Sequence, residues 1–312
     1  MIIMKHSPDV TQLNLRSKHM HFVRSYAKIN LTLDVLGQRS DGYHELITIM
    51  QTVDLYDTIC LTPSKNCRVR IICTRSELSN DDNLAIRATQ AIRRKLNLTQ
   101  GLDIELHKRI PVAAGLGGGS SNAAAVLLAL RDWWQLPLST ADLQTMAADL
   151  GSDVPFFLTG GLALCEGRGE RITPLAYHLP SSMRWIILVK PAISVSTAAV
   201  FRNLTAQDYS DGTASRSVLA ALAEGRNQLP LESLHNSLEH SVLEQYPQVA
   251  QAREDMLQAG APYVRLSGSG PTLFSTFSNL SEATQVQQQL YAQGYEVYLT
   301  HPVYPELAKE VE

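Results

Sequence analysis

The sequence contains few cysteines, and their spacing is unlike that of a metal or redox site. Only 4 of the 312 residues are cysteines, Cys60, Cys67, Cys73 and Cys165, and no two of them form a Cys-x-x-Cys pair. This spacing disfavours a zinc ribbon or a redox motif and favours reduced thiols in a cytosol-like compartment. The sequence also lacks a hydrophobic run as long as a membrane span, which predicts a soluble protein. We therefore expect a cytoplasmic location, or the plastid stroma if the source is a plant or an alga.

Charged residues are sparse and nearly balanced. They make up 18% of the chain, and the formal net charge is −3. A protein that binds nucleic acid or an anionic membrane needs an excess of positive charge on one surface, and the composition shows no such excess. Small molecules are therefore the expected partners, with no nucleic acid and no membrane, and the chain is expected to be a monomer or a weak homodimer.

The length of the chain predicts two domains behind a short N-terminal extension. Residues 1–20 are polar and aperiodic and lack the apolar stretch of a secretory signal, so we expect a loose extension with Met20 as an alternative start. The rest of the chain is long enough for two hydrophobic cores. The break at Pro180-Ser181-Ser182 predicts an N-terminal domain over 21–179 and a C-terminal domain over 180–312.

Alternating polarity predicts a long strand over 21–37 with one buried face. The apolar face would contain Ala27, Ile29, Leu31, Leu33 and Val35, and the polar face Tyr26, Lys28, Asn30, Thr32 and Asp34. Further strands are expected over 43–53, 58–62, 68–73 and 102–108, and helices over 83–96 and 139–151.

The C-terminal half alternates helices with short strands. Helices are expected over 197–203, 247–259 and 281–291, and strands over 184–190, 263–266, 272–277 and 295–300. The polar segment 209–230 predicts a variable helical insertion. A helix followed by the order β-β-α-β is typical of an α+β sandwich, so the expected fold class is α+β.

A glycine-rich loop dominates the middle of the chain. Gly115 and Gly117–Gly119 allow positive φ angles and a close approach to a ligand, and Ser120 and Ser121 offer N-cap hydroxyls to a helix that continues to about Trp134. Unpaired N–H groups at such a helix start favour a phosphate. The alternative is a glycine-rich helix cap without a ligand.

Three familiar phosphate loops do not match this stretch. A Walker A loop ends in Gly-Lys-Ser/Thr, but no lysine occurs between Lys108 and Lys190. A dinucleotide fingerprint would need a glycine where Ser120 stands. The later signatures of a protein kinase are missing as well.

Lys28 and Asp153 are the candidate reactive groups. Lys28 projects from the predicted strand with Tyr26 and Asn30, although a lone strand lysine is more often solvated. Asp153 precedes an apolar tract, Val154–Phe157, that would partly desolvate its carboxylate. A nearby cation would keep the group ionised, and it would then suit the removal of a proton from a hydroxyl. The alternative is a turn aspartate without a reactive role.

The tract Pro111-x-x-x-Gly115-Leu116-Gly117-x-x-Ser120-Ser121 resembles the ATP-binding motif of the GHMP kinases, the superfamily of galactokinase, homoserine kinase and mevalonate kinase. Three further tracts resemble one branch of it, the kinases of 4-diphosphocytidyl-2-C-methyl-D-erythritol in the non-mevalonate isoprenoid pathway. These tracts are Tyr26–Leu31, Gly37–Leu46 and Gly151–Leu158. Arg265–Pro271 resembles the third GHMP signature.

The resemblance implies a fold, a reaction and a set of residue roles. The fold would be a two-domain GHMP kinase, with an N-terminal domain like ribosomal protein S5 domain 2 and a ferredoxin-like C-terminal domain. The reaction would use ATP to phosphorylate the 2-hydroxyl of the cytidyl substrate, with Asp153 as general base and Lys28 as its cationic partner. The resemblance implies these ATP-binding residues: Pro111, Val112, Ala113, Ala114, Gly115, Leu116, Gly117, Gly118, Gly119, Ser120 and Ser121.

The same resemblance assigns the second substrate and leaves alternatives. Tyr43 and Phe201 match the aromatic residues that stack on cytosine, and His44 matches the residue whose backbone reads it. Asn30 is a candidate ligand of the erythritol or of a phosphate oxygen. Mg²⁺ would be held mainly by ATP and water, with Ser120 or Ser121 as a candidate ligand. The alternatives are a homoserine or mevalonate type of GHMP kinase and a GHMP-fold binding protein without catalysis.

Overall fold

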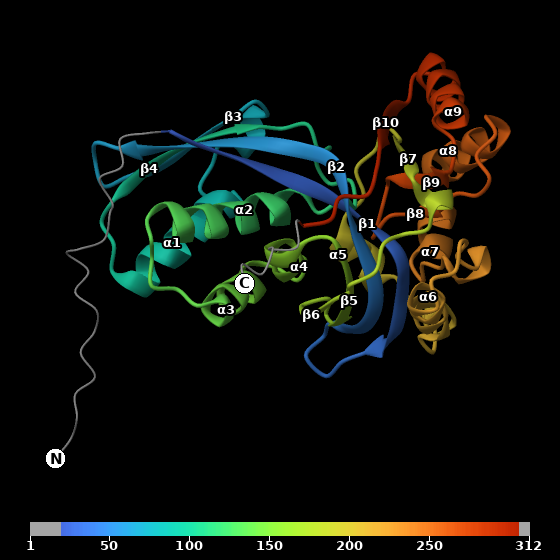
Figure 1. Ribbon diagram of the computed structural model, residues 1–312, viewed down its shortest axis with the longest axis horizontal. Helices are drawn as coiled ribbons and strands as arrows, with labels where there is room; N and C mark the ends of the chain where they lie inside the picture. Colours follow the sequence, from blue (N-terminus) through green and yellow to red (C-terminus); the bar gives the residue numbers. More distant parts are fainter. Residues whose placement is uncertain (1–19, 306–312) are drawn as a thin grey trace, which may run out of the picture.

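The computed structural model describes residues 20–305, which form two β-sheets with helices packed on them (Figure 1). Six strands of this part of the chain form the first sheet, in the order β3-β4-β2-β5-β6 with β1 also paired to β2. These strands are β1 (His21–Gln38), β2 (His44–Ser64), β3 (Val69–Cys73), β4 (Gly101–His107), β5 (Leu162–Gly167) and β6 (Arg171–Pro174). The predicted α+β class is confirmed. The expected N-terminal extension lies outside the described residues except for Met20.

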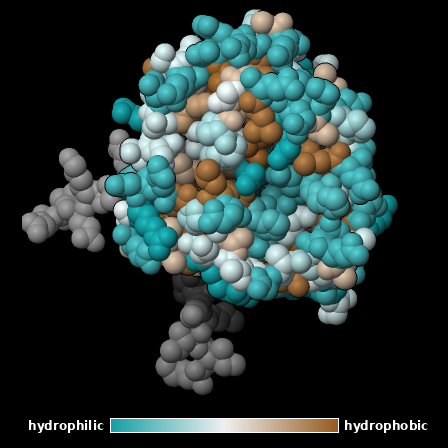
Figure 2. Space-filling model, turned by 90° about the vertical axis from the view of Figure 1, so that its right-hand side faces the viewer, coloured by the Kyte–Doolittle hydropathy of each residue, from teal (hydrophilic) through white to brown (hydrophobic). Residues whose placement is uncertain are grey.

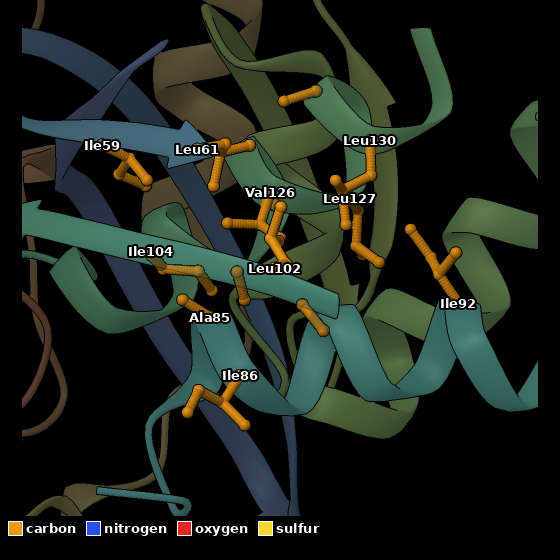
Figure 3. Packing of buried hydrophobic residues seen from close by; sticks show 14 of the residues in the cluster. Ile59, Leu61, Ala85, Ile86, Ile92, Leu102, Ile104, Val126, Leu127 and Leu130 are labelled. Carbon is orange, nitrogen blue, oxygen red and sulfur yellow. The ribbon is translucent and has the colours of Figure 1, made fainter. Parts of the chain in front are cut away.

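Helices cover one face of the first sheet and form a hydrophobic core with it (Figures 1 and 3). They are α1 (Leu84–Leu96), α2 (Gly118–Trp133), α3 (Thr140–Leu150) and α4 (Val154–Thr159). The predicted starts of α1 and α3 are confirmed by their caps. The Asn83 side chain accepts a hydrogen bond from the Ala85 N–H, and Ser139 forms a capping box with Asp142.

The second sheet is antiparallel and has the strand order β10-β7-β9-β8. Its strands are β7 (Trp185–Lys190), β8 (Arg265–Leu266), β9 (Leu273–Phe277) and β10 (Glu296–Thr300). The helices of this half are α5 (Thr197–Arg202), α6 (Thr213–Ala223), α7 (Glu239–Gln245), α8 (Pro247–Gln258) and α9 (Leu280–Ala292). Figure 2 shows the molecule from the right-hand side of Figure 1, where the second sheet and its helices lie. This surface is mostly hydrophilic, with separate hydrophobic areas. The predicted domain boundary at residue 180 falls between β6 and β7 and stays a prediction.

β2 is one continuous strand, although the sequence predicts two, over 43–53 and 58–62. In the structure, the register with β1 shifts between these two ranges, from Tyr26 opposite Tyr56 to Ala27 opposite Val53, and pairing resumes on both sides. A bulge of this kind absorbs the extra residues without ending the strand.

β1 has the predicted extent, but the prediction of one buried face is wrong. Lys28, Asn30, Thr32 and Asp34 are all buried, as are the apolar residues between them. The two faces also exchange along the strand, because Asn30 pairs with Met50 whereas Thr32 pairs with Ile49. The additional residue, Leu31, forms a β-bulge that inverts the alternation of side chains.

The hydrophobic clusters reflect this inversion. Ala27, Ile29 and Leu31 pack in one cluster, whereas Leu33 and Val35 pack in another. Single-sequence alternation cannot reveal such a change because a bulge shifts the period by one residue.

β1 and β2 also contact segments of the C-terminal half. The Leu33 N–H donates to the His235 carbonyl at 2.7 Å, and the Ser237 N–H donates to the Leu33 carbonyl at 2.8 Å. After β10, the Val303 N–H donates to the Thr52 carbonyl at 2.9 Å. In the described part of the chain, no helix is both long and apolar enough to cross a membrane.

Candidate active site

A cleft of about 930 Å³ lies between the two halves and is lined by residues of both. Its size is within the usual range for small-molecule sites. It brings together nearly all of the predicted site residues: Lys28, Asn30, Tyr43, His44, Pro111–Ser120, Asp153 and Phe201. Ser121 is the exception, because it is buried within α2 and its N–H donates to the Gly117 carbonyl.

The glycine loop enters the cleft along the start of α2. Gly115 and Gly117 have φ angles of +74° and +69°, which glycine adopts readily. Gly117 is the N-cap of α2, so the expectation that Ser120 and Ser121 act as N-caps is wrong. The cap position has a left-handed backbone, which favours glycine over serine. The first N–H groups of α2, at Gly118 and Gly119, have no carbonyl partner within the helix and can bind an anion.

Lys28 and Asp153 lie close together, from β1 and from the start of α4. Lys28 Nζ is 3.6 Å from Asp153 Oδ2. The lysine side chain is buried, whereas that of Asp153 is 32% exposed and lines the cleft. An accessible carboxylate beside a buried ammonium can accept a proton from a substrate hydroxyl, and the ammonium can balance the charge that develops.

Asn30 lies behind Lys28. Its Oδ1 accepts a hydrogen bond from Lys28 Nζ at 2.6 Å, and its Nδ2 donates to Thr48 Oγ1 at 2.8 Å. Both polar atoms of the Asn30 side chain are therefore already paired within the protein. A direct role for Asn30 in substrate binding stays a prediction.

Aromatic residues gather in one part of the cleft, here called its aromatic end. The ring centroids of His44 and Phe201 are 5.3 Å apart at an interplanar angle of 37°, and Tyr209 contacts His44 from a further side. Tyr43 is 52% exposed, and the Arg168 guanidinium lies 4.7 Å from its ring centroid. Burial lowers the pKa of His44 and so disfavours the charged form of its ring. This end suits a flat, polar ring such as a nucleobase.

The sequence reasoning missed a buried polar network around Asp57. The carboxylate accepts hydrogen bonds from Lys108 Nζ at 2.5 Å and Asn122 Nδ2 at 2.9 Å. It also accepts bonds from the backbone N–H groups of Arg109 and Ile110, at 2.7 and 2.9 Å. The network connects β2 to the segment before the glycine loop and to α2. The only sequence signal was an aspartate between two predicted strands, at the start of the second.

The described residues offer few side chains that could bind a metal ion. Among the described residues, no group of three or more His, Cys, Asp or Glu side chains could hold a metal ion. Within the glycine loop, Ser120 lines the cleft and has a side-chain oxygen. This fits Mg²⁺ that is carried largely by nucleotide phosphates and water.

Known protein families and curated relatives match this chain along most of its length. The model of the GHMP kinases N terminal domain matches residues 83–161, and that of the GHMP kinases C terminal region matches residues 218–296. A 4-diphosphocytidyl-2-C-methyl-D-erythritol kinase of Alkaliphilus metalliredigens is 43% identical over 86% of this chain and 91% of its own length. The enzyme of that name from Gloeobacter violaceus is 41% identical over 85% of this chain and 88% of its own length.

The fold of this chain is also similar to those of solved structures. A crystal structure of 4-(cytidine 5'-diphospho)-2C-methyl-D-erythritol kinase has a TM-score of 0.78 and 32% sequence identity, over 91% of this chain and all of that one (100%). Homoserine kinase from Cytophaga hutchinsonii has a TM-score of 0.70 at 18% identity, over 93% of this chain and 96% of its own. That second similarity shows the fold alone.

Proposed function

Because the chain belongs to the GHMP kinases, and within them to the 4-diphosphocytidyl-2-C-methyl-D-erythritol kinases, we propose that it transfers the γ-phosphoryl group of ATP to the 2-hydroxyl of 4-diphosphocytidyl-2-C-methyl-D-erythritol. The products are the 2-phosphate and ADP. The observation that carries the proposal is the Lys28–Asp153 pair, which shares one cleft with the glycine loop and the aromatic residues.

In the proposed reaction, Asp153 accepts the proton of the substrate hydroxyl. The hydroxyl oxygen then forms a bond to the γ-phosphorus, and the bond from that phosphorus to the oxygen of ADP breaks. Lys28 donates to Asn30 and faces Asp153, and its ammonium stabilises the negative charge on the reacting oxygens. The main contribution of the protein is therefore positioning and charge stabilisation.

The donor occupies the glycine loop in this proposal. Backbone N–H groups of Gly118 and Gly119 donate to phosphate oxygens, and the hydroxyl of Ser120 adds a further donor or a metal ligand. When bound with ATP, Mg²⁺ would reduce the repulsion between phosphate oxygens. Ser120 is the side chain that would hold it, with ATP and water as the other ligands.

The cytidine of the acceptor occupies the aromatic end of the cleft. Tyr43 and Phe201 supply ring faces, and the backbone of His44 supplies hydrogen-bonding groups. An acceptor that carries a nucleotide can then contact the aromatic residues while its hydroxyl lies beside Asp153. The cytoplasmic location and the oligomeric state expected from the sequence stay predictions.

The direct test is a phosphotransfer assay with the purified protein, MgATP and three separate acceptors. These acceptors are the cytidyl substrate, homoserine and mevalonate. Only the first is expected to be phosphorylated, as measured by ADP release and by ³¹P NMR of the product. Equal or faster transfer to either of the other two would assign the chain to another GHMP kinase type. A lack of transfer to all three would favour the binding-protein alternative, against which the preserved Lys28–Asp153 pair argues.

Replacement of Tyr43 by alanine is expected to raise the KM for the cytidyl substrate roughly 10-fold or more, because stacking of a base on an aromatic ring is lost. The KM for ATP should stay within about a factor of two. Tyr291→Ala is a matched control, since Tyr291 is also an exposed tyrosine but lies on α9 away from the cleft. A larger effect on ATP than on the acceptor would show that the two pockets are assigned in the wrong order.

A further inference from the structure

We propose that Thr48 is a positioning residue for the phosphoryl transfer. Its hydroxyl sets the orientation of the Asn30 side-chain amide, and that amide holds the Lys28 ammonium beside Asp153. This inference rests on the proposed function, because it concerns the same reactive pair.

Three consecutive hydrogen bonds carry the inference. Thr48 is fully buried on β2, and its Oγ1 donates to the Thr32 carbonyl at 2.5 Å. The same Oγ1 accepts from Asn30 Nδ2 at 2.8 Å. Asn30 Oδ1 then accepts from Lys28 Nζ at 2.6 Å. The series ends at the ammonium, 3.6 Å from Asp153 Oδ2.

The proton count makes this series directional. A threonine hydroxyl has one proton to donate, and here the Thr32 carbonyl receives it. The Thr48 oxygen can therefore only accept from its other neighbour, so the NH₂ group of Asn30 must face it. The carbonyl oxygen of the Asn30 amide then faces Lys28, which is the orientation an ammonium requires. In the flipped orientation, the N–H groups of the amide would face the N–H groups of Lys28.

The pairing of β1 with β2 places Thr48 next to Asn30. Thr48 is paired with Leu33 in the strand register, beyond the bulge, whereas Asn30 is on the near side of it. The Ile49 N–H donates to Thr32 Oγ1 at 3.1 Å, while the Thr32 backbone carbonyl accepts the Thr48 hydroxyl. Asn30 is paired with Met50, which is two residues from Thr48 on β2, so the side chains of Asn30 and Thr48 lie on the same side of the β1–β2 pair, where both line the cleft.

Loss of the Thr48 hydroxyl has a defined consequence. The Asn30 NH₂ group would lose its acceptor in a buried environment, and a flipped amide would no longer be excluded. Lys28 would then lose its acceptor in a fraction of the molecules. Turnover should fall, whereas the binding of either substrate should not, because the phosphate loop and the aromatic residues are unchanged.

The test compares Thr48→Val, which has nearly the same shape but no hydroxyl, with Thr48→Ser, which keeps the hydroxyl. Thr48→Val is expected to lower kcat roughly 10-fold, about the effect of one lost hydrogen bond, with both KM values within about a factor of two. Thr48→Ser is expected to restore most of kcat. Thr89→Val is the matched control, because Thr89 is also fully buried but bonds only within α1, to the Ala85 carbonyl.

A double-mutant cycle shows whether Thr48 acts through Asn30. In the Asn30→Ala background, Thr48→Val is expected to cause no further loss of kcat. A normal kcat for Thr48→Val, a rise in KM alone, equal losses for the Val and Ser variants, or full additivity with Asn30→Ala would each overturn the inference. If Thr48→Val does not fold, Thr48→Ala is measured against Thr48→Ser in the same way.

The outcome is separable from that of the proposed function. Turnover is measured with whichever of the three acceptors the wild-type protein phosphorylates fastest. If that acceptor is not the cytidyl substrate, the proposed function fails while the comparison of the Thr48 variants still stands. If the wild-type protein phosphorylates none of them, both proposals fail, because no transfer remains for Thr48 to position.

Discussion

Replacement of Asp153 by asparagine is expected to lower kcat by at least about 10²-fold, the usual contribution of a general base. The amide has the shape of the carboxylate but cannot take a proton from the acceptor hydroxyl. It also leaves Lys28 without its anionic neighbour at 3.6 Å. Binding of ATP should be nearly unchanged, because the glycine loop does not depend on this side chain. Steady-state kinetics and calorimetric titration with a non-hydrolysable ATP analogue measure the two effects separately.

Asp149→Asn is the matched control for this change. Asp149 is an exposed residue near the end of α3, shortly before Asp153 in the sequence, and it does not line the cleft. It removes the same charge from the same region, so its kcat should be close to that of the wild type. Near-normal turnover in Asp153→Asn would remove Asp153 from the mechanism, and an equal loss in Asp149→Asn would indicate a general electrostatic effect.

Replacement of Gly115 by alanine is expected to lower kcat/KM for ATP by about 10²-fold, because the added methyl group displaces the glycine loop from the position in which it binds the phosphates. A Cβ at this position would lie 2.1 Å from the Ser267 carbonyl oxygen, a backbone atom of the facing turn. The backbone φ of +74° adds strain to any side chain there. The loop must therefore move away from the turn. Initial rates at varied ATP concentration, together with thermal unfolding, measure the result.

Gly225→Ala separates the two causes. Gly225 has a similar φ of +65°, but no atom lies within 4 Å of the position of its Cβ. This control reports the cost of the left-handed backbone alone, and it should lower the melting temperature without a change in ATP kinetics. If both variants bind ATP normally, contact between the loop and the Ser267 turn is not needed for the donor site.

The local elements that the sequence predicted well have their signals in a few neighbouring residues. The starts of α1 and α3 follow from Asn83 and Ser139, whose side chains bond to the first N–H groups of the helices. The faces of β1 depended instead on the bulge at Leu31, which is defined by pairing with β2. No residue type in the strand marks that position, so the alternation predicted the wrong partners for Leu33 and Val35.

The candidate site divides in a similar way. Lys28, Asp153 and the loop could be found because they lie in motifs that resemble a known family. Thr48 and Asp57 could not, since a polar residue in a strand has the same sequence signal whether it faces water or a buried partner. The serines after the loop were assigned to the helix cap because serine is common there, whereas the left-handed backbone at Gly117 favours glycine.

The hydrogen bonds between Leu33 and the 235–237 segment have a thermodynamic consequence. β1 belongs to the ladder of the first sheet, and it is also the partner of a segment from the C-terminal half. If either half unfolds completely, the other half loses the backbone hydrogen bonds between Leu33 and residues 235–237. We therefore expect the two sheets to unfold together, so that a substitution that weakens one half lowers the free energy of unfolding of both.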